Sequence, residues 1–212
     1  MRTEDFILAL GADAALRGPS LSRRVALALA AGACVSLAVF MAALGPRPDI
    51  AAAARTVRFD LKFLDTLTLL LPSALICLRL SRPEASAGAV LAWLLAPAAL
   101  LALALGVELA TVPADLWFRK VVGHNWLHCL TLVPVFSIPP LTALVLALRE
   151  GAPRYPGLTG ALAGMAAAGV SATIYATNCT DDSPLFVATW YPLATGIVAL
   201  AGFFAGRRWL TW

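Results

Sequence analysis

Six long apolar segments constrain the fold of this chain more than any other feature of its sequence. A helix needs about 20 mostly apolar residues to cross the hydrocarbon core of a bilayer. The stretches that meet or approach this length are 25–44, 63–78, 87–109, 126–148, 157–177 and 184–205. The sequence therefore predicts an all-α polytopic membrane protein, a bundle of six transmembrane helices.

Composition supports a single membrane domain. Of the 212 residues, 60% are hydrophobic and 13% are charged, whereas soluble domains have about 45–50% apolar and about 25% charged residues. We expect a cytoplasmic segment at 1–24 with a short amphipathic helix, followed by the transmembrane domain at 25–212. The net charge of +4 has no cluster of Lys and Arg behind it, so the sequence predicts no direct binding of nucleic acid.

The distribution of Lys and Arg predicts the orientation. The N-terminus, the loops after the second and fourth spans, and the C-terminus carry 10 of these residues, and the opposite loops carry 6. Lys and Arg are enriched on the cytoplasmic side of membrane proteins. We therefore expect both termini in the cytoplasm (N-in/C-in), with the lipid bilayer as surrounding partner.

Two features of the spans concern packing. Gly160, Gly164, Ala168 and Ala172 are spaced four apart and share one helix face, which can approach another helix closely. Several spans contain proline, such as Pro140 in the fourth, and we expect neighbouring helices to satisfy the carbonyls that proline leaves free.

Two cysteines are predicted at the same membrane depth. Cys129 lies in the first turn of the fourth span and Cys179 lies just after the fifth, so both fall on the periplasmic side. His128 adjoins the first cysteine, and Asp181 and Asp182 follow the second. Three interpretations stay open: a structural disulfide, a thiol pair that senses an oxidant or a soft metal, or two unconnected residues.

Residues next to these cysteines have simpler structural interpretations. Ser183 is suited to cap the sixth helix, with the two preceding acids near the positive end of its dipole. Asp65 and Glu108 lie near the outer ends of their spans. Such residues could line a path for ions, but we expect them to reach the membrane interface. Cys34 and Cys77 are expected to behave as small packing residues.

The N-terminal segment has the pattern of a short helix. Thr3 is suited to cap it, acids occupy its first turn, and its apolar residues share one face. Such a helix can lie on the membrane surface or dock onto a soluble partner, and its acidic start argues mildly against the membrane. The residues predicted to make the docking contact are Thr3, Glu4, Asp5, Phe6, Ile7 and Leu10.

The sequence carries no enzyme signature such as a nucleophile elbow, an HExxH motif or a phosphate-binding loop. We therefore expect no enzymatic activity and no cofactor, and the sequence leaves metal binding open. The residues alone leave two classes of function open. One is a small membrane transporter or a thiol oxidoreductase, although the CxxC pair usual in the latter is lacking. The other is a structural or assembly subunit.

Motifs along nearly the whole chain resemble the NrsF family of membrane anti-sigma factors. They are Thr3–Leu8, Leu44–Asp49, Arg79–Pro83, His128-Cys129, Pro139–Leu141, Leu148–Pro153, Cys179–Val187 and Trp190-Tyr191. The resemblance implies a protein of the bacterial inner membrane that sequesters an extracytoplasmic-function (ECF) sigma factor until a stress signal arrives, with paired cysteines as sensor. Asn178 departs from the expected His, which weakens a metal site but leaves a thiol switch unaffected.

Overall fold

The computed structural model of this protein describes residues 3–4, 20–82 and 88–211. This part of the chain is helical and contains no strand, and six of its helices are long and apolar enough to cross a membrane. The predicted all-α, six-helix class is therefore confirmed. The long helices are α2 (Leu21–Ala43), α4 (Val57–Leu80), α5 (Leu95–Thr111), α7 (Trp126–Leu148), α8 (Pro156–Ala176) and α9 (Pro184–Trp209). The short ones are α3 (Ile50–Ala53), η1 (Gly88–Leu94), η2 (Ala114–Leu116) and α6 (Trp117–Val122).

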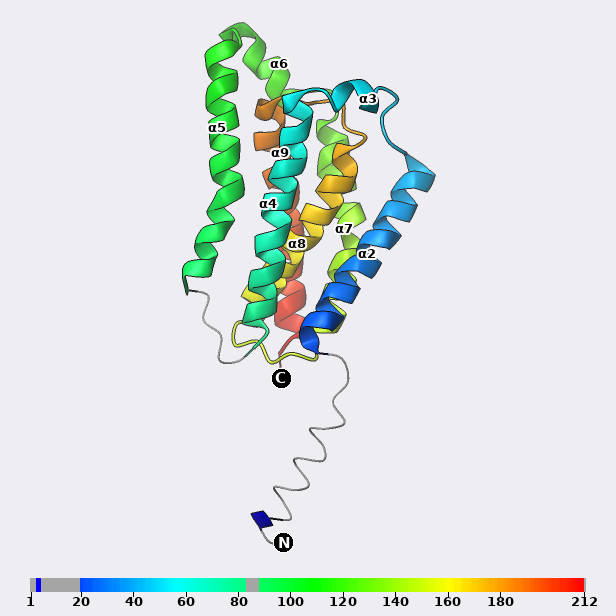
Figure 1. Cartoon of the computed structure of the whole chain (residues 1–212), viewed down its shortest axis with the longest axis vertical. Coiled ribbons are helices and arrows are strands. Elements are labelled where there is room, and N and C mark those ends of the chain that lie inside the picture. Colours follow the sequence, from blue (N-terminus) through cyan, green and yellow to red (C-terminus); the bar gives the residue numbers. More distant parts are fainter. Residues whose placement is uncertain (1–2, 5–19, 83–87, 212) are drawn as a thin grey trace.

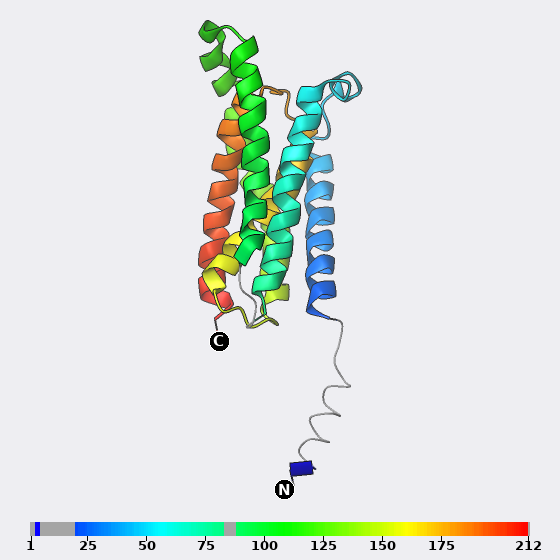
Figure 2. The same cartoon turned by 60° about the vertical axis from the view of Figure 1, so that its left-hand side comes forward.

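The helices pack around α8, which contacts α4, α7 and α9, while α2 packs against α7. Helix α5 stands at the edge of the bundle, with α4 and α9 as its main neighbours (Figure 1; Figure 2). Helix α2 begins and α9 ends at the same end of the bundle, which we call the base. The loops at 44–56, 112–125 and 177–183 lie at the opposite end, called the distal end (Figure 1).

Helix α4 is longer than the predicted span 63–78. It begins at Val57, and Thr56 caps it by accepting a hydrogen bond from a backbone N–H of the first turn. Its first turns contain Lys62 and Asp65, whose side chains are buried in the bundle. Because these polar residues lower the local hydropathy, the apolar run alone places the start of the helix too late.

Helices α8 and α9 approach so closely that their contact requires glycine. A Cβ atom on Gly160 would lie 2.2 Å from the carbonyl oxygen of Gly202, and one on Gly164 would lie 2.4 Å from that of Val198. Ala168, one turn further on, also packs with Val198. The close approach predicted for this face of α8 is therefore confirmed, and small residues at the contact allow it.

The contact between α2 and α7 shows how the bundle accommodates proline. Pro140 has no N–H, so the carbonyl of Phe136 loses its partner within the helix. The Ser36 hydroxyl of α2 donates to this carbonyl oxygen at 2.7 Å. Gly32 allows the approach, since a Cβ there would lie 2.3 Å from Cα of Pro140. A neighbouring helix thus satisfies the freed carbonyl, as expected.

Candidate functional site

The two predicted cysteines lie in one buried cluster at the distal end. Cys129 is in the first turn of α7 and Cys179 follows α8, and both side chains are 0% exposed. Both are free thiols, not bonded to each other. The other buried members of the cluster are Val133, Ala172, Tyr175, Phe186, Val187, Tyr191 and Ala194. The fold therefore brings together two residues that are far apart in the sequence.

Two cations hold the backbone of Cys179 in place. Lys62 Nζ donates to its carbonyl oxygen at 2.9 Å, and Arg47 Nη1 donates to the same oxygen at 3.3 Å. Both cations also contact Asp182, Lys62 at 2.5 Å and Arg47 at 2.9 Å. The Lys62 side chain is 1% exposed and that of Asp182 is 21% exposed, so the cation of this ion pair is buried and its carboxylate is partly buried. Through these contacts the position of Cys179 depends on α4 and on the loop between α2 and α3.

The surroundings of Arg47 and Cys179 shift their protonation. Arg47 forms a two-pronged ion pair with Asp49, with both N–O distances 2.7 Å. This hydrogen bonding raises the pKa of Arg47 and lowers the pKa of Asp49. Burial raises the pKa of the Cys179 thiol. At neutral pH the buried thiol is therefore protonated, and a protonated thiol is a poor nucleophile.

Asp181 binds the turn that precedes helix α7. Its Oδ2 accepts hydrogen bonds from the backbone N–H groups of His124 (2.9 Å) and Asn125 (2.7 Å) and from the Asn125 side-chain amide (2.9 Å). Gly123, with a φ of 61°, precedes this turn, and a Cβ there would lie 2.8 Å from Cγ of Asp181. The two acids were expected to serve the start of α9, but Asp181 binds the α6–α7 loop and Asp182 binds two cations.

A second polar centre surrounds Glu108 of α5. Its side chain is 3% exposed and contacts Arg58 at 2.6 Å and Lys120 at 2.8 Å. The Ser183 hydroxyl donates to the same carboxylate at 3.1 Å and forms no cap on α9, so the predicted cap is wrong. Glu108 and Asp65, which were expected to reach the membrane interface, are both buried among the helices. Ser183 and Glu108 bind partners on other helices, and the local sequence gives no sign of these partners.

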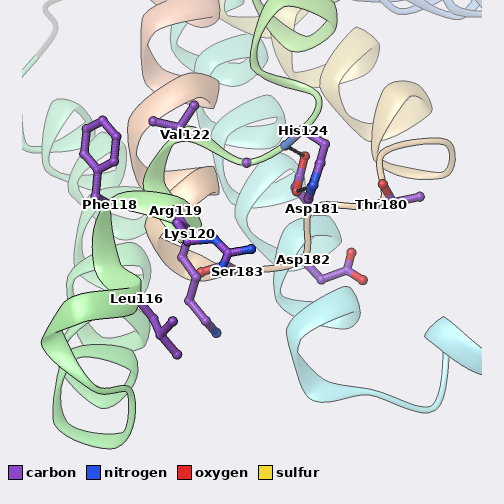
Figure 3. Close-up of a pocket in the computed structure, with 11 residues that line it drawn as sticks. Leu116, Phe118, Arg119, Lys120, Val122, His124, Thr180, Asp181, Asp182 and Ser183 are labelled. Atoms are coloured by element: carbon purple, nitrogen blue, oxygen red, sulfur yellow. Dashed lines mark hydrogen bonds and ion pairs between the residues drawn. The ribbon is translucent and has the colours of Figure 1, made fainter.

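The polar contacts around Cys179, Asp181, Asp182 and Glu108 at the distal end are called the hub. A cavity of about 560 Å³, lined by charged and apolar residues, opens beside this hub. Residues of α6, including Arg119 and Lys120, line it on one side, and residues 180–183 line it on the other (Figure 3). His124 lies at its edge and is 3.6 Å from Asp181. Solutes in water can therefore reach the residues directly after Cys179, while the thiol itself is covered.

The remaining predicted site residues lie apart from the cluster. His128 is exposed, and its imidazole has no hydrogen bond or ion pair with another described residue. Across residues 3–4, 20–82 and 88–211, no group of three or more His, Cys, Asp or Glu side chains is placed to hold a metal ion. Cys77 is buried and donates to the Thr159 carbonyl at 3.4 Å, as a packing residue would, whereas Cys34 is exposed.

Most of the predicted docking segment lies outside the described residues. Thr3 and Glu4 are helical and exposed. Asp5, Phe6, Ile7 and Leu10 are among the residues that the structure does not describe.

Sequence reasoning missed several residues of the hub, namely Arg47, Lys62, Asn125 and Asn178. The first two were assigned to orientation, although a charge beside an apolar span is a signal of a buried polar site. Asn178, which departs from the expected His, donates its side-chain amide to the carbonyl of Gly45 at 2.8 Å. It thus fixes the same loop as Arg47, whose backbone N–H binds the carbonyl of Thr177.

The six helices of spanning length are compatible with a multi-pass membrane protein. The loop contacts that fix the thiol cluster give it a polar hub at one end. The chain belongs to the NrsF family, described as "Negative regulator of sigma F", whose model matches residues 8–212. The Anti-sigma-F factor NrsF of Caulobacter vibrioides is 35% identical to it over 217 residues, covering 100% of both chains. The Probable anti-sigma-F factor NrsF of Azospira oryzae is 33% identical over 219 residues, again covering 100% of both. No solved structure matches the chain. Membership of this family makes it an anti-sigma factor, a regulator whose partner is a sigma factor.

Proposed function

We propose that the chain holds an ECF sigma factor at the cytoplasmic face of the bacterial inner membrane and releases it when the Cys129–Cys179 pair is modified. The single observation that carries this proposal is the burial of both thiols in one cluster at the distal end. The base faces the cytoplasm in this proposal, which the excess of Lys and Arg in the base loops and termini supports. The names of the two relatives favour a partner of the sigma-F kind.

The signal in this proposal is an oxidant or a soft metal ion. Oxidation would join the two sulfurs, with two electrons and two protons passing to the oxidant. A metal would displace both thiol protons. His128, Asp181 and Asp182 lie near the pair in sequence and complete the proposed sensing set. Because the Cys179 thiol is buried and protonated, the signal acts during a local opening of the hub.

The hub supports a route from the thiols to the rest of the bundle. Lys62 and Arg47 bind the carbonyl of Cys179, so displacement of Cys179 would disturb α4 and the loop after α2. Packed helices adopt discrete arrangements, and a small change at one end can shift the other. The sigma factor in turn is proposed to be held by the N-terminal segment, through Phe6, Ile7 and Leu10 with the preceding Thr3, Glu4 and Asp5.

A sigma-dependent reporter in cells tests the role of the cysteines. Cys129→Ser and Cys179→Ser should change repression, or its response to oxidant, to similar extents. The double variant should add little, because residues that act as one unit are not additive. Cys77→Ser, at a buried position, and Cys34→Ser, at an exposed one, are the controls and should leave the response intact. Additive effects of the two substitutions, or a normal response in the double variant, would contradict the proposal.

A further inference from the structure

Asp65 is a carboxyl group without a partner inside the bundle. It lies on α4, its side chain is 5% exposed, and its carboxyl oxygens form no hydrogen bond or ion pair with any other described residue. At 1.5 Å per residue it lies about 12 Å along the helix from Val57. An ionisable group inside a membrane domain is costly unless it has a partner, so it marks a functional site.

A largely apolar cavity of about 320 Å³ lies against Asp65. It is bounded by α4, α5, α8 and α9, and Leu69, Leu101 and Met165 form part of its wall. Tyr191 also lines it, and the Tyr191 hydroxyl is a second buried group without a partner in the described part of the chain. An apolar chamber with a few convergent polar groups is the usual form of a small-molecule site, and this volume is within the usual range.

We propose that this cavity binds the head of a membrane-soluble quinol, whose phenolic hydroxyl donates a hydrogen bond to the carboxylate of Asp65. The planar ring matches the apolar wall, and the hydroxyl supplies the donor that the carboxylate lacks. A phospholipid would bring only its acyl chains to this depth. A hard divalent cation would need about six oxygen ligands, and the cavity offers one carboxyl group.

The cavity adjoins the cysteine cluster, because Ala172 and Tyr191 belong to both. Binding of a quinol would therefore change the packing of the helices that enclose the two thiols. The quinol site rests on Asp65 and its cavity, and it stands whether or not the cysteines sense a signal.

Binding of ubiquinol-1 to the full-length protein in detergent, measured by anaerobic titration calorimetry, tests this site. Gly196 lines the cavity, and a Cβ there meets no atom within 4 Å, so the side chain of Gly196→Leu starts from open space and would occupy part of the chamber. Wild type should bind at one saturable site, and Gly196→Leu should lose that binding. Asp65→Asn should weaken it about ten-fold, since a hydrogen bond to a charged acceptor is roughly twice as strong as a neutral one.

Two substitutions at comparable positions serve as controls. Gly106 on α5 also has open space at its Cβ but lies outside the cavity lining, and Asp60 is exposed on α4. Gly106→Leu and Asp60→Asn should bind ubiquinol-1 as wild type does. Absence of saturable binding to wild type, or unchanged binding by Gly196→Leu, would overturn the site. Unchanged binding by Asp65→Asn would overturn the assigned hydrogen bond.

Discussion

Replacing Asp182 by alanine should destabilise the protein, because it leaves a buried cation without its counterion. Lys62 is 1% exposed and contacts Asp182 at 2.5 Å. After the substitution its remaining hydrogen-bond acceptor would be the carbonyl of Cys179. Arg47 would keep its pair with Asp49, so the loss falls mainly on Lys62.

The expected magnitude follows from the burial of the pair. Removing one partner of a buried ion pair costs about 3–5 kcal/mol. Asp182 retains 21% exposure, which favours the lower end, about 3 kcal/mol. For a chain of this length about 1 kcal/mol lowers the unfolding temperature by about 2–4 °C, so the midpoint should fall by about 6–12 °C.

The buried cysteines of the protein provide the assay. Cys77, Cys129 and Cys179 are buried and Cys34 is exposed, so a thiol-reactive dye reports unfolding in a Cys34→Ser background. Asp60→Ala, at an exposed position of the same helix as Lys62, should shift the midpoint by about 2 °C or less, because exposed substitutions change stability by about 0.5 kcal/mol at most.

The double variant separates the ion pair from other effects of the substitution. Adding Lys62→Met to Asp182→Ala removes the stranded charge, and apolar replacement of a buried ion pair is often neutral or stabilising. The double variant should therefore recover most of the lost stability. If it is no more stable than Asp182→Ala, or if that single variant melts like Asp60→Ala, the assigned role of the pair is wrong.

Three further predictions concern helix packing, the pH dependence of stability and the binding of the sigma factor. Gly160→Leu should lower the free energy of unfolding by about 1–3 kcal/mol through overpacking against α9, while Gly106→Leu, in open space, should not. Above about pH 8.5 an unfolded cysteine loses its proton, whereas burial raises the pKa of Cys179. The native state then binds more protons, so stability should fall as pH rises, and circular dichroism melting of Cys179→Ser should show a smaller fall. Phe6→Ala should weaken binding of the sigma factor about 30-fold, because losing an aromatic contact costs about 2 kcal/mol, and membrane insertion should not change. Full repression after deletion of residues 1–20 would show that the sigma factor binds elsewhere on the protein.

The number of helices was predictable because apolar length is a local property of the sequence. The start of α4 was not, because hydropathy places the start of the span after the charged Lys62, whereas the fold buries this side chain within the helix bundle. A buried charge is recognised only when its partner is known.

The candidate site, like the helices, was predictable only in part. Helix order and alternating direction were enough to predict that Cys129 and Cys179 share one end of the bundle. The contacts around Cys179 could not be predicted from the sequence, since Lys62 binds the carbonyl of Cys179 across 117 residues and Arg47 binds Asp182 across 135. Ser183 shows the converse error, because a local cap was predicted where the hydroxyl binds Glu108 on another helix.

The most direct test of the account is the affinity of the full-length protein for its sigma factor before and after thiol modification. The protein would be placed in lipid nanodiscs and titrated with the sigma factor, first reduced and then after treatment with diamide or with cadmium ions. We predict that at least one treatment lowers the affinity by at least ten-fold, that dithiothreitol or a chelator respectively restores it, and that the Cys129→Ser/Cys179→Ser double variant does not respond. Equal affinities in all states of the wild-type protein, or the same loss in the double variant, would contradict a thiol pair that controls release.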